Sequence, residues 1–202
     1  MRRSTMVLAL AMVAAAPLAA QSSIGHSVDL ALSYREGSHT MSMSWHAQFG
    51  LANRRIWLGA GLRSSAMLTY TRDFDLSDGG GPSQRQIADP RVQTLNLMFT
   101  GDVMVTRRFG AGLNLDLIGG SHGGTRIQGA QQFRPAHLNL FKGGESDRGS
   151  LNSEFYVRYN VDGRTAIRVG AAHYVLGYED RQTDARYNRF VTAPFVGLRV
   201  GF

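Results

Sequence analysis

Polar and apolar side chains alternate at every second position in eight segments of this chain. Such alternation puts one kind of side chain on each face of a β-strand and does not suit an amphipathic helix. Beyond the first twenty residues, no window holds the 18 consecutive apolar residues that indicate a transmembrane helix. The pattern predicts an all-β fold, with strands expected at residues 27–34, 41–49, 56–70, 95–106, 110–117, 154–161, 167–178 and 190–202.

The connections between these segments alternate between short and long. Three are tight, at 51–55, 107–109 and 160–164, and Asp162-Gly163 in the last is a strong hairpin signal. The other four, at 35–40, 72–91, 119–150 and 179–188, are longer and polar. Short periplasmic turns opposite long extracellular loops are typical of an eight-stranded antiparallel up-and-down transmembrane β-barrel. An even number of strands then places both chain ends on the periplasmic side.

The seventh segment changes phase along its length. Ile167 and Val169 are apolar at odd positions, whereas Tyr174, Leu176 and Tyr178 are apolar at even positions. A β-bulge adds one residue to a strand and turns the following side chains to the opposite face. The sequence therefore predicts a bulge near Ala172 and His173.

The polar faces of the segments carry matched charges, which helps to decide which face is inside. A solvated face would more often carry Lys and Glu freely, without this balance and without many Gly residues. Paired charges and small residues suit the inside of a narrow membrane barrel, where each buried ion needs a partner. We therefore expect an interior network made by Asp29, Arg63, Asp102, Asp116, Glu154, Arg158, Arg168 and Arg199. The alternative is a soluble, lipocalin-like barrel with the apolar face inside.

The first twenty residues have the pattern of a secretory signal peptide. Arg2 and Arg3 precede an apolar run at 6–16, and small residues follow Pro17 up to a cleavage point expected after Ala20. The alternative of a membrane anchor is disfavoured, because eleven apolar residues fall short of the roughly 20 that span a bilayer. We therefore expect a signal peptide at 1–20 and a barrel domain at 21–202.

The chain ends in a strand whose apolar residues occupy every second position and whose last residue is aromatic. These residues are Val196, Leu198, Val200 and Phe202. They resemble the C-terminal signature of bacterial outer-membrane barrels, which their insertion machinery recognises. Together with the signal peptide and the eight segments, the chain resembles small eight-stranded barrels of the outer-membrane protein A or X type. The resemblance implies location in the bacterial outer membrane, contact with its lipid and lipopolysaccharide, and recognition by the barrel-insertion machinery.

The amino-acid composition excludes several classes of ligand and binding partner. The chain has no Cys, which excludes a disulfide framework, a thiol nucleophile and a Cys-ligated metal site. Its net charge of +7 comes almost entirely from Arg, which is spread along the chain, so no nucleic-acid partner is expected. Loop arginines could instead bind lipopolysaccharide phosphates, because Arg binds phosphate bidentately. The candidates are Arg72, Arg91, Arg181 and Arg189, and the protein is expected to be a monomer.

Candidates for chemistry are few. Glu36, Ser38 and His39 share the first loop, and His173 precedes Glu179, Asp180 and Asp184 of the fourth. A catalytic triad needs a His within reach of both nucleophile and carboxylate, which neighbours in sequence rarely provide. The six His residues show no paired metal-ligand spacing. We therefore expect no catalytic residues, no metal and no cofactor.

Three functions stay open for the membrane barrel. The favoured one is a structural, envelope or surface-interaction role through the extracellular loops, with a plugged polar interior. A narrow pore or small-solute transporter is the second, although side chains fill the lumen of an eight-stranded barrel. An enzyme that modifies lipid A is the third. The soluble ligand carrier remains the alternative to all of these.

Overall fold

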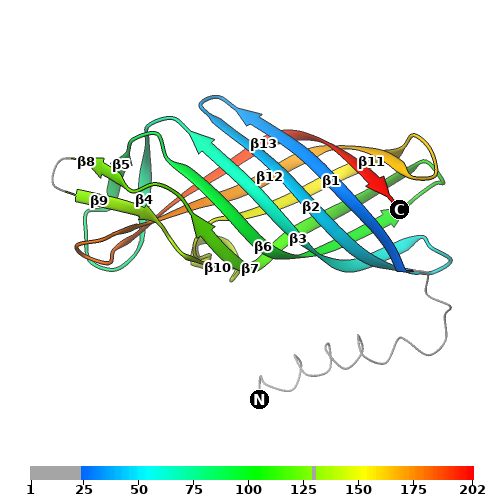
Figure 1. Ribbon diagram of the computed structural model, residues 1–202, viewed down its shortest axis with the longest axis horizontal. Helices are drawn as coiled ribbons and strands as arrows, with labels where there is room; N and C mark the ends of the chain where they lie inside the picture. The colour runs from blue at the N-terminus through cyan, green and yellow to red at the C-terminus, as the bar shows by residue number, and fades with distance from the viewer. Residues whose placement is uncertain (1–23, 129–130) are drawn as a thin grey trace, which may run out of the picture.

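The computed structural model describes residues 24–128 and 131–202 and consists almost entirely of β-strands (Figure 1). The predicted signal peptide lies outside these residues. In the part of the chain that the structure describes, no helix is long and apolar enough to span a membrane. Eight long strands form the body of the molecule: β1 (Ile24–Arg35), β2 (Ser38–Leu51), β3 (Ile56–Thr69), β6 (Arg91–Met104), β7 (Phe109–His122), β11 (Leu151–Asn160), β12 (Thr165–Asp180) and β13 (Arg186–Gly201).

These eight strands form a closed antiparallel barrel. Each pairs with the next long strand along the chain, and β13 pairs with both β12 and β1. In the closing pair, Asp29 of β1 lies opposite Arg199 of β13. The predicted fold class, an eight-stranded antiparallel up-and-down barrel, is therefore confirmed.

Burial along the strands shows which face is inside. Leu30 and Val157 are 53% and 62% exposed on the outer wall. Asp29 and Arg63 are buried inside, at 1% and 0%. A soluble barrel would have the opposite arrangement, because water rather than lipid would contact its wall. The apolar wall and polar interior therefore identify a transmembrane barrel.

The predicted bulge in the seventh strand is wrong. The pairing of β12 with β11 and β13 continues without a register shift through Ala172 and His173. Arg168, Tyr174 and Leu176 all point to the interior, so the side chains on the inner face change from polar to apolar while the strand stays regular. A bulge occurs instead in β7, where Leu117 is skipped between the partners of Leu97 and Met98.

The two ends of the barrel differ greatly in size. The turns at 52–55, 105–108 and 161–164 are short, as predicted. At the opposite end, however, two of the four expected long loops are also tight. β1 and β2 are joined only by Glu36 and Gly37, with Gly37 at a φ of 74° that favours glycine. The link 181–185 is short because β12 and β13 continue far beyond the other strands.

The remaining two loops build a small head on these extensions (Figure 1). β4 (Arg72–Asp78) pairs with β13, and β9 (Gln131–Pro135) pairs with β12. β5 (Gln84–Ile87) and β8 (Arg126–Gln128) complete two hairpins, while β10 (Leu138–Leu140) returns to pair with β7. A short 3-10 helix, η2 (Gly144–Ser146), precedes β11. The head and the barrel therefore share strands and form one sheet.

Candidate functional site

The interior of the barrel at the level of the apolar wall contains a dense network of charged groups, here called the polar layer. Arg199 donates two hydrogen bonds to the carboxylate of Asp29, at 2.7 and 2.9 Å. The same carboxylate lies 3.0 Å from Arg168 and 2.9 Å from Nε2 of His46. Because β1 and β13 are neighbours, the register of the closing pair is what brings Asp29 and Arg199 together.

Asp102 holds the part of the polar layer nearest the short turns. Its carboxylate is 2.6 Å from Arg199 and 3.4 Å from Arg158. It also accepts hydrogen bonds from the hydroxyl of Tyr156 at 3.0 Å and from the side-chain amide of Gln48 at 2.9 Å. All four of these partners are donors, as a buried anion requires.

Arg63 joins strands that are not neighbours in the barrel. From β3, it reaches Asp116 of β7 and Glu154 of β11, each at 3.2 Å. Glu154 also pairs with Arg168 of β12 at 3.0 Å. These ion pairs extend across the lumen. Their side chains therefore neutralise the buried charges and also occupy the cross-section of the barrel.

The structure thus places all eight charged residues expected in the interior within one connected set, made of four carboxylates and four guanidinium groups. Replacing an ion pair like these with apolar residues can be neutral, but removing one partner typically costs about 3–5 kcal/mol. The stability of each buried charge in this network therefore depends on the presence of its partners.

Several interior residues were not singled out from the sequence. His46, Tyr156 and Asn114 lie on the inward face that the alternation defines, and that position was their only signal. Asn139 gave no signal, because it comes from β10 in the third loop. Its amide donates to Asn96 at 2.8 Å, and its carbonyl accepts from Ser121 at 2.6 Å.

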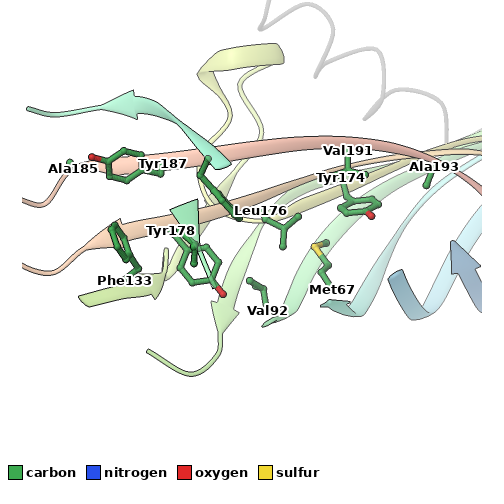
Figure 2. Close-up of a cluster of buried hydrophobic side chains, with 12 residues drawn as sticks. Met67, Val92, Phe133, Tyr174, Leu176, Tyr178, Ala185, Tyr187, Val191 and Ala193 are labelled. Atoms are coloured by element: carbon green, nitrogen blue, oxygen red, sulfur yellow. The ribbon is translucent and has the colours of Figure 1, made fainter. Parts of the chain in front are cut away.

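Above the polar layer, toward the head, the interior becomes apolar. Figure 2 shows this apolar layer, in which Tyr174, Leu176 and Tyr178 of β12 face Met67 of β3 and Val92 of β6. The head contributes Phe74 from β4 and Phe133 from β9, whose rings meet Tyr178 and Tyr187 edge-on. The cluster consists of Met67, Phe74, Ile87, Val92, Phe133, Tyr174, Leu176, Tyr178, Ala185, Tyr187, Val191 and Ala193.

At the other end, the short turns surround an open cavity of about 830 Å³. We call it the periplasmic cup, because the short turns of outer-membrane barrels face the periplasm. Its wall includes the indole of Trp57, which donates to the backbone carbonyl of Arg54 at 2.9 Å. Arg158 and Arg199 of the polar layer form its floor. Four further arginines belong to the turns around the rim: Arg54, Arg55, Arg107 and Arg164.

The four loop arginines considered for lipopolysaccharide do not form one site. Arg189 donates to the backbone carbonyl of Asp73 at 2.9 Å, which holds it beside Arg72. Arg91 lies at the start of β6, where its backbone amide donates to the hydroxyl of Tyr178. Arg181 is in the β12–β13 turn and donates its backbone amide to Gln132. Only Arg72 and Arg189 are therefore neighbours.

The residues considered for catalysis are also separated. Ser38 points inward and shares a 2.6 Å hydrogen bond with Thr69, whereas the ring of His39 lies outside against Tyr34. His173 shares a 2.8 Å hydrogen bond with Thr192, while Glu179 pairs with Arg134 and Arg186. Among the described residues, no group of three His, Asp or Glu side chains could hold a metal ion.

The C-terminal strand presents its apolar residues to the surroundings of the barrel. Val196, Leu198, Val200 and Phe202 are between 43% and 72% exposed. Phe202 stacks with His26 at a centroid distance of 6.1 Å, close to Trp45. Aromatic side chains at this end of the wall suit the interface between lipid and water.

The closed barrel, its apolar wall and its polar interior define the class: an integral β-barrel protein of the bacterial outer membrane, embedded in lipid. No family model matches the sequence, and no curated protein matches it. The chain is similar to the crystal structure of Neisserial surface protein A, NspA, with 14% identity, 91% of this chain and 100% of that chain covered, and a TM-score of 0.41.

A second similar structure is the Yersinia pestis outer-membrane protein Ail in a phospholipid bilayer nanodisc. It is 10% identical, with 89% of this chain and 100% of that chain covered and a TM-score of 0.42. The CymD monoaromatic hydrocarbon channel is 8% identical, with 89% and 88% covered and a TM-score of 0.21. These identities are too low to carry a function from one protein to another, so the function has to follow from the residues of this chain.

Proposed function

We propose that this protein is a sealed, non-conducting barrel that displays its β-sheet head on the outer surface for recognition. The observation that carries the proposal is that two different layers block the lumen in series. A solute that passed the apolar layer would still meet the paired charges of the polar layer. A narrow pore would need a continuous polar path, and no observation favours one.

The head has the features of a recognition surface. Ile127 is 69% exposed, although it lies in β8, a short strand beyond the barrel. By sequence, the extracellular segments 35–37, 70–91, 123–150 and 177–189 contain eleven basic and ten acidic residues. A nearly neutral surface with exposed apolar side chains fits a protein partner better than a polyanion.

Contacts with the membrane form the second part of the proposal. Arg72 and Arg189 are positioned at the base of the head, where lipopolysaccharide phosphates of the outer leaflet would be available to their guanidinium groups. Val196, Leu198, Val200 and Phe202 would be the residues that the barrel-insertion machinery recognises. Because the eight long strands close on themselves, the barrel wall offers no strand edge to a second copy, and the protein functions as a monomer in this proposal.

Single-channel recording in planar bilayers tests the seal. The wild-type protein should give no conductance steps, and regular steps that persist after repeated purification would contradict the proposal. A variant without residues 131–150 serves as the comparison, because it removes β9, β10 and Asn139, which contribute to both layers. That variant should show leakage if it inserts, as judged by its heat-dependent gel mobility.

The position of the head can be tested by cysteine labelling, because the chain contains no cysteine. G124C lies in the third loop and G163C in a short turn, and a Cβ added at either glycine meets nothing within 4 Å. A membrane-impermeant maleimide should label G124C on intact cells and G163C only after the outer membrane is opened. The reverse result would place the head in the periplasm and end the proposal.

A further inference from the structure

The positive charge of this protein is concentrated at one end of the barrel. The twelve residues of the turns 52–55, 105–108 and 161–164 include five arginines and a single carboxylate, Asp162. The polar layer contains equal numbers of acids and bases, and the head is nearly neutral. Most of the excess charge of the described residues therefore surrounds the periplasmic cup.

Two side-chain carboxylates near the cup are already engaged. Asp102 pairs with Arg158 and Arg199 at the floor. Asp162 accepts hydrogen bonds from the backbone amides of Arg164 and Thr165, at 2.7 and 2.6 Å. Among the described residues, no carboxylate lies within 4 Å of the guanidinium groups of Arg54, Arg55 or Arg107, and none lines the cup.

Like charges held around one cavity repel each other, and an anion bound between them would relieve that repulsion. Guanidinium groups bind phosphate through two parallel hydrogen bonds, which favours them over lysine for this purpose. One phosphate monoester carries about 1.5 to 2 negative charges at pH 7. Two phosphate groups therefore approach the charge of the four arginines at the rim.

We propose that the periplasmic cup binds a soluble anion that carries two phosphate groups and enters along the barrel axis. The cup is large enough, because its 830 Å³ falls within the range of small-molecule sites. It is a closed end and not a channel mouth, since Arg158 and Arg199 at its floor are held by Asp102. Headgroups of the surrounding lipid lie around the wall, outside this space.

Arg107 and Arg108 provide a matched pair for the test, because they are adjacent in one turn. Arg107 lines the cup, whereas Arg108 points to the outer wall and donates to the hydroxyl of Tyr159 at 3.4 Å. Replacing either by Gln removes the same charge from the same end of the barrel. Only R107Q removes a group from the cup.

The experiment is calorimetric titration of the full-length mature protein in phosphatidylcholine nanodiscs with inorganic pyrophosphate at low ionic strength. The wild type should bind, and R107Q should weaken binding about tenfold, the loss expected for one charge-assisted hydrogen bond. R108Q should stay within about twofold of the wild type, because it lacks contact with the cup. The double variant R55Q/R107Q should show no measurable binding.

Three results would overturn the proposal. The wild type could fail to bind pyrophosphate, or R107Q and R108Q could weaken binding equally, which would indicate only the general charge of this end. Binding could also disappear when cardiolipin is added to the nanodiscs, which would assign the cup to a lipid headgroup. Heat-dependent gel mobility shows whether each variant is folded. Loss of binding by a folded R107Q protein can therefore be assigned to the missing guanidinium group and not to unfolding.

Discussion

The interior of this barrel is polar at one level and apolar at the next, although the same strands run through both. Arg168 and Leu176 lie eight residues apart on the inner face of β12, and both are fully buried. Beside Arg168, the outward-facing Ile167 and Val169 are exposed on the wall. Beside Leu176, Val175 and Gly177 are also buried, and the backbone of Gly149 in the third loop packs against Gly177, so this part of β12 has no exposed apolar wall.

The difference shows that the medium outside a strand decides what its inner face contains. Where lipid surrounds the wall, apolar side chains face outward, and the remaining polar side chains must satisfy one another inside. Where other segments of the chain cover the strands and water surrounds the molecule, burial of apolar side chains inside is favourable again. We therefore expect β12 to leave the membrane between Ala172 and Tyr174.

The largest effect should follow from breaking a single pair in the polar layer. Among the described residues, Arg63 alone pairs with Asp116, so R63M leaves that carboxylate buried without a counter-ion. We expect the free energy of unfolding to fall by about 3–5 kcal/mol. Urea unfolding in phosphatidylcholine liposomes, followed by tryptophan fluorescence, measures the change.

The double variant R63M/D116N tests whether the cost comes from the unpaired charge. Because D116N removes that charge, the double variant should be more stable than R63M by more than 1 kcal/mol. Equal stability of the two variants would show that packing of the arginine, and not its charge, supports this layer. Glu154 keeps Arg168 as a partner in both variants, so it does not disturb the comparison.

In the apolar layer, the corresponding change is L176A. It should leave a cavity and lower the free energy of unfolding by about 3 kcal/mol, as usual for a buried leucine. Because the layer connects the head to the barrel, we expect faster trypsin cleavage of the head while the barrel keeps its heat-dependent gel mobility. I127A is the control, since Ile127 is 69% exposed in the head and its loss should change stability by less than about 0.5 kcal/mol.

The eight long strands could be predicted from the sequence because alternation is a local signal that depends only on neighbouring positions. The same signal showed that Arg63 and Glu154 share the inner side of the barrel. It could not show that Arg63 pairs with Asp116 across the lumen, because that contact depends on the register and curvature of the three strands β3, β6 and β7.

The prediction failed where two physical causes give the same pattern. A change of phase in β12 can come from a bulge or from a change of solvent, and the sequence does not distinguish them. Tyr178 was accordingly assigned to the apolar outer face but lies in the interior. The head strands were missed for a different reason: β4, β5, β8 and β9 are short and polar, and they form only because β12 and β13 offer free edges.

A smaller loss of stability should distinguish residues that face lipid from residues that face water. Val157 on the wall and Ile127 on the head are similarly exposed, at 62% and 69%. V157R would place a charge in lipid and should lower the free energy of unfolding by about 2 kcal/mol, whereas I127R should change it by less than about 0.5 kcal/mol. Similar losses for both variants in liposome unfolding would contradict the proposed membrane level.

The smallest effect concerns the third environment, the water at the short turns. Two backbone amides, of Arg164 and then of Thr165, donate to the carboxylate of Asp162 and hold its pKa below its ordinary value. Because the pKa is lower in the folded state, the stabilisation of the turn is present above the unfolded pKa and is lost as the pH falls through the folded pKa.

The amide proton shifts of Arg164 and Thr165, measured by NMR in nanodiscs, should therefore titrate with a midpoint below the ordinary value for aspartate. In D162N they should not titrate in this range, and the neutral variant should also keep its heat-dependent gel mobility. A midpoint at or above the ordinary value would mean that the carboxylate is free in solution. Because the carboxylate of Asp162 is fully exposed, its titration should not change the chemical shifts of the polar layer. The resonances of Tyr156, which lies in that layer, provide the internal control.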